Sequence, residues 1–348
     1  MTKERPRTGR PAERALYRLE DLAELAGVSI STVSRALNDS DLVSDRTKKK
    51  IRTLAQSHNY AGRLRRKLYG AEQTRIISVV IPPPQGRDRR ISDPFLLDLI
   101  GGLADALIER DCDLLISHTM PSDYDGVARL VASERTDGFV FLGQSTLHDH
   151  LNALAAQGAA FVVWGAQLPN QKYCSVGSDN LRGGHRATSH LIRLGRRRIA
   201  FVGDTDAPEV RLRFQGYKNA LADAGIAFDP ELVRPTNFFI ESAMETVEAL
   251  IEGAVSFDGV FGASDLIALG AIRGLANNGL AVPADVSVVG YDDIHMAAYS
   301  SPALTTVRQD VAKAGRMLLG KLVRMLDGEK VRSELLPTEL IVRESCGG

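Results

Sequence analysis

The chain has 348 residues, too many for one compact core, and its 44% hydrophobic and 25% charged residues are typical of a globular protein in water. Basic and acidic residues are equal in number, but residues 1–73 carry an excess of seven positive charges and the remainder an excess of seven negative charges. The sequence lacks an apolar run for a membrane span or a signal peptide, so we expect a cytoplasmic protein whose basic part meets a polyanion.

Three short helices are predicted in the basic part. Apolar residues at helical spacing predict the first over 19–26, and Gly27 allows a sharp turn because glycine tolerates positive φ. Ser29 is a good N-cap for the second helix, and the run Ser44-Asp45-Arg46-Thr47 opens the third. Two helices joined by a glycine corner predict a helix-turn-helix, which lays its second helix in the DNA major groove.

The second helix of this unit carries several hydroxyl groups, although such residues tend to disturb helix interiors. Short hydroxyls donate to phosphates and bases without filling the groove, which explains their presence if the helix binds DNA. Arg35 can pair with guanine, and Ile30 can pack on a thymine methyl group. We assign Ser29, Thr32 and Ser34 to phosphates, Ile30, Ser31 and Arg35 to bases, and Asn38 to the same interface. The alternative is a three-helix module that binds protein.

The stretch LEDLAELAGVSISTVSRALN, followed by VSDRTKKKIRTLAQSHNY, closely resembles the headpiece of the lactose-repressor/galactose-repressor (LacI/GalR) family. The family pattern is D-V-A-x-x-A-G-V-S, then T-V-S-R-x-L-N, then V-S-x-x-T-x-x-x-I and N-Y. Arg18 and Glu20 are mild departures from it. The resemblance implies a DNA-binding headpiece over residues 17–60. We expect the basic arm over residues 1–16 to be disordered, the alternative being that residues 7–11 reach an adjacent minor groove.

The linker at residues 61–74 matches the family less closely. The family has a proline and then a short hinge helix whose leucine wedges into the minor groove, whereas this chain has Gly62 in place of the proline. The resemblance implies that Arg63 and Arg66 bind phosphates and that Leu68 or Tyr69 is the wedge. A basic tether that never folds is the alternative.

From residue 75 onward, short apolar runs alternate with amphipathic helical patterns. Such alternation predicts parallel sheets with helices on both faces, and ligands bind beyond the carboxyl ends of their strands. The runs fall into two sets that divide near residues 174–179, which predicts two lobes with a cleft between them. The predicted strands are 76–81, 113–117, 138–143, 161–165, 198–203, 257–264 and 286–292, and the predicted helices are 94–110, 123–135, 147–157, 180–195, 209–225, 241–253 and 265–278.

Aromatic and polar residues at these strand ends fit a neutral sugar, because rings stack on aromatic faces while Asp and Arg bridge adjacent hydroxyls. Trp164, Ser264 and Asp292 end strands, Arg213 lies early in a helix, and Phe238 lies in a connection. Each has a plainer interpretation: Trp164 as core, Arg213 as a surface ion pair, and the pair Asp292-Asp293 as a helix cap.

The family resemblance extends over the rest of the chain and implies specific roles. The segments RLRFQGY, FGASDLIALG and VSVVGYDD match family segments that bind the effector through Arg213, Ser264 and Asp292. Val311 follows the match TTVRQD, where some members place an aromatic residue, and Phe95 follows Asp93 at the start of a helix beside the cleft. Trp164 and Phe238 fall at pocket positions.

The family core resembles periplasmic sugar-binding proteins, with three strands that cross between the lobes. Here we expect these crossings near residues 176–178, 304–308 and 335–339. The expected N-terminal lobe is therefore 75–177 plus 308–337, and the C-terminal lobe is 178–307 plus 338–348.

The sequence therefore predicts a homodimeric repressor of carbohydrate-utilisation genes that binds a palindromic operator and responds to a small sugar. A corepressor-dependent member that binds a nucleobase or a phosphorylated metabolite is the alternative within the family. A sugar-uptake protein or a sugar-acting enzyme would not explain the basic headpiece. No nucleotide-binding or nucleophile motif is present, and Cys112, Cys174 and Cys346 lie far apart, so we expect no catalysis, metal or cofactor.

Overall fold

The computed structural model describes residues 19–37, 40, 42–57, 74–82, 93–117, 124–132, 136–144 and 147–347. The chain divides into two compact units, with a boundary between Thr74 and Arg75. Most of the predicted linker, with Arg63, Arg66, Leu68 and Tyr69, lies outside the described residues, as do Asn38 and the arm at 1–16. Within the described ranges, none of the helices has the length and hydropathy needed to cross a membrane.

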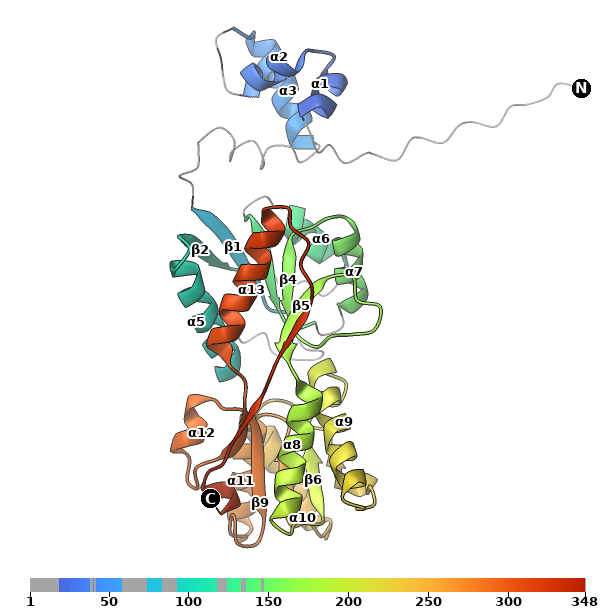
Figure 1. Cartoon of the computed structure of the whole chain (residues 1–348), viewed down its shortest axis with the longest axis vertical. Helices are drawn as coiled ribbons and strands as arrows, with labels where there is room; N and C mark the ends of the chain where they lie inside the picture. Colours follow the sequence, from blue (N-terminus) through green and yellow to red (C-terminus); the bar gives the residue numbers. More distant parts are fainter. Residues whose placement is uncertain are drawn as a thin grey trace, which may run out of the picture. The chain divides into compact units, whose positions relative to one another are not determined.

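The N-terminal unit, which we call the headpiece, contains the three predicted helices: α1 (Leu19–Ala26), α2 (Ile30–Leu37) and α3 (Asp45–Ser57) (Figure 1). One side chain from each helix, Leu22, Val33 and Ile51, is fully buried in a common core. Gly27 has a φ of +68° at the corner between α1 and α2, where a side chain would be strained. The headpiece is therefore a helix-turn-helix unit with a core of its own.

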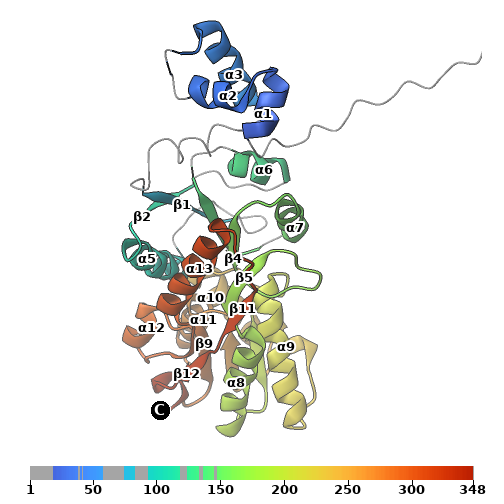
Figure 2. The ribbon, with the colours of Figure 1, turned by 45° about the horizontal axis from the view of Figure 1, so that its top comes forward.

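The second unit, the body, contains two sheets of six strands each, and each sheet defines a lobe (Figures 1 and 2). The strand order is β11-β5-β4-β3-β1-β2 in lobe 1 and β12-β10-β9-β8-β6-β7 in lobe 2, and the only antiparallel pair among the described strands is β10 with β12. The strands are β1 (Arg75–Val80), β2 (Cys112–Ile116), β3 (Gly138–Leu142), β4 (Phe161–Trp164), β5 (Cys174–Ser178), β6 (Ile199–Val202), β7 (Val233–Arg234), β8 (Gly259–Gly262), β9 (Ser287–Asp292), β10 (Thr305–Arg308), β11 (Glu334–Leu336) and β12 (Glu339–Ile341).

Helices cover both faces of each sheet because successive side chains of a buried strand point to opposite faces. In β3, Val140 and Leu142 join the core under α5 and α13, whereas Phe139 and Phe141 join the core under α6 and α7. The helices of the body are α5 (Pro94–Ile108), α6 (Tyr124–Ala132), α7 (His148–Ala156), α8 (Asn180–Arg193), α9 (Pro208–Asp223), α10 (Ile240–Glu252), α11 (Asp265–Asn277), α12 (His295–Tyr299) and α13 (Val311–Leu326), with 3₁₀ turns at Pro230–Leu232 and Glu344–Cys346.

The chain crosses between the lobes three times. The crossings follow β5, β10 and β11, at residue 179, residues 309–310 and residues 337–338. The first two lie just beyond the predicted positions, because β5 and β10 are each hydrogen-bonded throughout into the sheet of one lobe. Figure 1 shows the third crossing as the red segment that leads from lobe 1 to lobe 2.

Candidate DNA interface and interlobe effector site

The N-terminal end of α2 presents a cluster of hydroxyl groups. Ser29 Oγ accepts a hydrogen bond from the backbone N–H of Thr32 at 3.2 Å, as expected for an N-cap. The same oxygen lies 2.9 Å from Ser31 Oγ and 2.8 Å from Thr32 Oγ1. Several hydroxyls at a helix N-terminus, where backbone N–H groups are also available, form a favourable environment for a phosphate.

The side chains predicted to read bases lie on the outward side of α2. Ile30 is 45% exposed although it is a large apolar residue, and Ser31 and Arg35 are also exposed. Ser34 is half-buried, closer to the headpiece core. An exposed isoleucine beside an exposed arginine fits a surface that contacts base edges and thymine methyl groups.

The third helix adds positive charge, but one of its lysines has a structural role. Lys50 Nζ donates to the backbone oxygen of Ala26 at 2.9 Å and so gives a hydrogen-bond partner to the last carbonyl group of α1. A cavity of about 420 Å³ lies between α1 and α3, lined by Leu25, Arg46, Lys49, Lys50, Thr53 and Leu54.

Arg213, on α9 of lobe 2, is buried and held from several directions. Its Nε donates to Asn180 Oδ1 at 2.8 Å, and its Nη1 donates to the backbone oxygen of Ala263 at 2.5 Å. Its guanidinium carbon lies 3.7 Å from the centre of the Tyr291 ring, and Nη1 lies 3.8 Å from Asp292 Oδ1. The side chain is therefore a fixed cationic group in the interior, and not the surface ion pair considered as its plainer interpretation.

The close packing of α8 on α9 makes this placement of Arg213 possible. A Cβ on Gly184 of α8 would collide with the backbone oxygen of Arg213, and a Cβ on Gly216 of α9 would collide with that of Leu181. Two glycines thus bring the backbones together and place Asn180, at the start of α8, within hydrogen-bond distance of Arg213.

Asp292, the last residue of β9, lies beside Arg213 and is 8% exposed. Gln309 Nε2 donates to its Oδ1 at 2.7 Å, and the backbone N–H of Gln309 donates to its carbonyl oxygen at 3.2 Å. Burial raises the pKa of Asp292 to about 7, Arg213 opposes this rise, and the nearby carboxylate of Asp93 adds to it. Burial thus favours the uncharged form of Asp292 more than it would be favoured in an exposed aspartate.

Lobe 1 contributes two aromatic rings near the boundary between the lobes. The ring centres of Phe95 and Trp164 lie 6.1 Å apart at an angle of 44°. Phe95 packs against the hydrophobic cores of both lobes, so it lies where the lobes meet. Asp93 caps α5 by accepting from the backbone N–H of Phe95 at 2.9 Å, and its charge interacts with Arg213 across the interface.

Three further residues belong to this interlobe site but were missed in the sequence. Asn180 accepts from Arg213 and directly follows the first crossing. Gln309 donates to Asp292 and directly follows β10. Glu209, one turn before Arg213 on α9, accepts from the backbone N–H of Ala166 in lobe 1 at 3.3 Å. A Cβ on Gly165 would lie 2.9 Å from Glu209 Oε1 and 2.6 Å from Gln144 Oε1, so glycine permits this approach of the lobes.

The remaining predicted effector residues are Ser264, Phe238 and Val311. Ser264 is buried and its Oγ caps α11 by accepting from the backbone N–H of Ile267 at 3.3 Å, which leaves the hydroxyl proton to donate elsewhere. Phe238 packs against the core of lobe 2, and Val311 packs at the start of α13 against the core of lobe 1. Phe95 thus packs against the cores of both lobes, whereas Phe238 packs against that of lobe 2 and Val311 against that of lobe 1.

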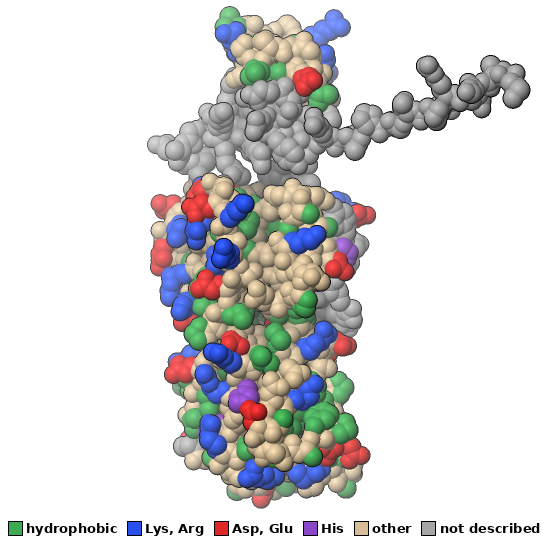
Figure 3. All heavy atoms as spheres, turned by 45° about the vertical axis from the view of Figure 1, so that its right-hand side comes forward, with side chains coloured by type: hydrophobic (Ala, Val, Ile, Leu, Met, Phe, Trp, Pro, Cys, Tyr) green, Lys and Arg blue, Asp and Glu red, His purple; other side chains and the backbone are tan. Residues whose placement is uncertain are grey.

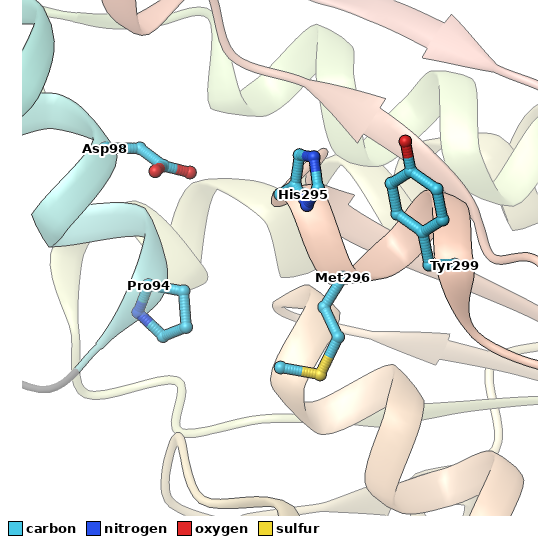
Figure 4. A pocket seen from close by; sticks show the side chains of 5 residues that line it. All are labelled: Pro94, Asp98, His295, Met296 and Tyr299. Atoms are coloured by element: carbon cyan, nitrogen blue, oxygen red, sulfur yellow. The ribbon is translucent and has the colours of Figure 1, made fainter.

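A separate cavity of about 420 Å³ lies between α5 of lobe 1 and α12 of lobe 2 (Figure 4). Figure 4 shows Pro94 and Asp98 on α5 facing His295, Met296 and Tyr299 across it. The rings of His295 and Tyr299 lie 4.8 Å apart. Within the described ranges, no group of three His, Cys, Asp or Glu side chains is arranged to hold a metal ion.

A helix-turn-helix unit and a body of two parallel-sheet lobes with buried polar groups between them define a ligand-responsive DNA-binding protein. Residues 18–62 match the family model described as bacterial regulatory proteins of the lacI family, and residues 188–346 match the periplasmic binding protein-like domain. The transcriptional regulator CelR of Thermobifida fusca is 32% identical over 333 residues, which cover 94% of this chain and 97% of CelR. The chain therefore belongs to the LacI family of DNA-binding transcriptional regulators.

Solved structures agree with this assignment. A complex of the regulator CelR with cellobiose is 31% identical, with a TM-score of 0.69 over 95% of this chain and all of that one. A LacI-family regulator from Enterococcus faecium with bound ribose is 30% identical, with a TM-score of 0.67 over 78% of this chain and 98% of that one.

Proposed function

We propose that this chain is a cytoplasmic repressor without enzymatic activity, which binds its operator as a homodimer and responds to a small carbohydrate held between the lobes. The observation that carries the sugar assignment is the buried pair Arg213 and Asp292 in lobe 2, together with the rings of Phe95 and Trp164 in lobe 1. A guanidinium and a carboxylate bridge vicinal hydroxyls, while aromatic faces cover the C–H face of a sugar ring. The cellobiose and ribose bound to the two related structures support this class of ligand.

Control of DNA binding requires that the sugar binds more tightly to one arrangement of the lobes than to the other. Both lobes contribute groups to the interlobe site, because Phe95 and Trp164 come from lobe 1 whereas Arg213 and Asp292 come from lobe 2. A ligand that contacts both sets favours the arrangement in which they lie together. We propose that this arrangement weakens operator binding, so that the sugar relieves repression.

The test is operator binding by the full chain, measured by fluorescence anisotropy on DNA from upstream of its own gene, with a panel of mono- and disaccharides that includes cellobiose and ribose. A sugar that lowers operator affinity about tenfold, or about 1.4 kcal/mol of coupling, is the expected result. Tight DNA binding with no effect of any sugar would refute the carbohydrate assignment, and a nucleobase panel would then be the next measurement.

Sugar affinity should depend on pH through Asp292. Its pKa of about 7 in the ligand-free protein means that a proton must leave before a carboxylate can accept from sugar hydroxyls. Affinity is therefore expected to be constant well above pH 7 and to fall as pH drops below it, by up to about tenfold per pH unit. Calorimetric titration between about pH 6 and about pH 8.5 measures this slope. The variant Asp292→Asn should bind more weakly and without the slope; an unchanged slope in that variant would assign the proton to another group.

The dimer interface that we propose lies on one side of the body, where exposed apolar side chains extend from lobe 1 to lobe 2. Strand β2 is an edge strand, and an exposed apolar edge needs to be covered by a partner. In Figures 1 and 2, α5 and α12 lie on the same side of the body, and residues of both line the cavity of Figure 4. We call this the apolar face, and it consists of Leu97, Ile108, Ile116, Met296 and Tyr299. The face shown in Figure 3 has positive and negative side chains interspersed.

Replacing Leu97 and Ile116 with glutamate should dissociate the homodimer, because each two-fold interface would then bury four carboxylates. We expect the dimer Kd, measured by sedimentation velocity, to rise about 100-fold or more. Leu335→Glu is the matched control, since Leu335 is also exposed but lies on β11, the opposite edge of the same sheet. Dissociation by Leu335→Glu, or none by the double variant, would place the interface elsewhere.

A further inference from the structure

Asp293, the neighbour of the effector-site aspartate, joins two arginines. Its Oδ2 accepts from Arg308 Nε at 2.6 Å, and its Oδ1 accepts from Arg343 Nη2 at 2.6 Å. The side chain is only 8% exposed, so these ion pairs are screened less by solvent than surface pairs are. No role was assigned to Asp293 from the sequence beyond that of a helix cap, and the start of α12 is not capped by a side chain.

The backbone around Asp293 is strained and needs external support. Asp292 has a φ of +121° and Asp293 a φ of +62°, which residues with a Cβ rarely adopt in succession. Each residue here has its own anchor: Gln309 binds Asp292, two arginines bind Asp293, and Asp265 accepts from the backbone N–H of Ile294 at 2.8 Å. The direction of the Asp292 carboxylate therefore depends on how its neighbours are held.

The two arginines connect this loop to the crossings between the lobes. Arg308 is the last residue of β10, directly before the second crossing, and its Nη1 also lies 3.5 Å from Oε2 of Glu339, directly after the third crossing. Arg343 follows β12, and its Nη1 donates to the backbone oxygen of Leu304 at 2.8 Å, just before β10. We call Asp293, Arg308, Glu339 and Arg343 the hinge cluster.

We propose that Asp293 is a positioning residue that couples the effector site to the crossing segments. It does so by fixing the strained turn at Asp292 to Arg308 and Arg343 at the same time. Arg308 and Arg343 lie at or near the ends of β10 and β12, on the lobe 2 side of the second and third crossings, so a change in lobe angle that displaces these strand ends would reach Asp292 through Asp293. The inference deepens the proposed function, on which its sugar-binding readout rests.

The experiment uses the full-length protein with the substitutions Asp293→Asn, Arg308→Gln and both together. Arg308 is half-exposed, so its replacement is expected to leave the fold intact. It removes the other partner of the ion pair with Asp293 and therefore tests the same contact. Glu329→Gln is the matched control, because it breaks an exposed pair with Arg324 (2.7 Å) beyond the end of α13. Two quantities are measured: the affinity for cellobiose and ribose by fluorescence of Trp164, the single tryptophan, and hydrogen–deuterium exchange of residues 286–296 and 304–311 in the sugar-free protein.

We expect Asp293→Asn to weaken sugar binding about tenfold and to accelerate exchange in both segments, with the double variant no worse than the stronger single variant, since the two residues act through one contact. Wild-type sugar affinity in Asp293→Asn, even with a lowered Tm, would reduce Asp293 to a structural role and overturn the proposal. If the wild type binds no sugar of the panel, the proposed function fails on its own. Exchange then still decides, because unchanged exchange in Asp293→Asn would refute the coupling to the crossings.

Discussion

Replacing Arg213 with alanine is expected to abolish the response to sugar, with a rise in sugar Kd of about 100-fold or more. The guanidinium is buried and serves Asn180, Ala263 and Asp292 together, so its loss removes a sugar contact and leaves Asp292 buried without its cation. Removing one partner of a buried ion pair costs about 3–5 kcal/mol. Trp164 fluorescence titrated with the sugar from the panel measures the loss.

Arg211→Ala is the control for this prediction. Arg211 lies two residues earlier on α9, is exposed, and donates to the backbone oxygens of Thr205 and Asp206, so its removal should leave sugar affinity unchanged. Operator binding without sugar reports whether Arg213→Ala is still folded and dimeric. Wild-type sugar affinity in Arg213→Ala would show that the effector binds elsewhere, and the cavity between α5 and α12 would be the next place to test.

Arg35→Ala is expected to weaken operator binding about 10- to 100-fold, in line with about 1–3 kcal/mol for a bidentate contact to guanine. It should also relax the preference at one base pair in each half-site. Because Arg35 is exposed on α2 and lies outside the headpiece core, the stability of the headpiece should not change. Anisotropy with the operator and its single-base variants, at one fixed salt concentration, measures both effects.

The contrast is Lys49→Ala, which removes an exposed cation from α3. A cation that meets phosphates contributes evenly to all sequences, so this variant should lose affinity without losing base preference. If Arg35→Ala kept the full preference of the wild type, α2 would not be the helix that reads the operator bases.

The order of helices and strands was predictable because buried parallel strands appear as unbroken apolar runs. The predicted strand 138–143 corresponds to β3 and the predicted helix 180–195 to α8, with differences only at the ends. The expected helices stopped at residue 278, although α13 has an amphipathic pattern and an N-cap at Asp310 that accepts from the backbone N–H of Lys313. The pattern of this segment was therefore sufficient to predict the helix, which was missed although residues 308–337 were expected in lobe 1.

Residues of the site could be predicted only where they belong to a recognisable local motif. Arg213 and Asp292 lie in recognisable segments, but their partners come from distant parts of the chain: Asn180 from the start of α8 and Gln309 from the end of β10. Glu209 gave no signal because its contact with Ala166 depends on how the lobes meet. The positive φ angles at Asp292 and Asp293 could not be predicted either, because a glycine in the sequence indicates such a backbone conformation whereas an aspartate does not.

The three crossings also determine when each part of the molecule can fold during synthesis. The headpiece has its own core, built from α1 to α3, which ends at residue 57, whereas lobe 1 lacks α13 and β11 until lobe 2 has been translated as far as β10. At about 5–20 residues per second, the ribosome needs roughly 15 to 60 s to pass from the end of α3 to the end of β12. A nascent chain therefore carries a folded DNA-binding unit long before it has a sensor. A message truncated ahead of α13 would yield a headpiece that no sugar could regulate.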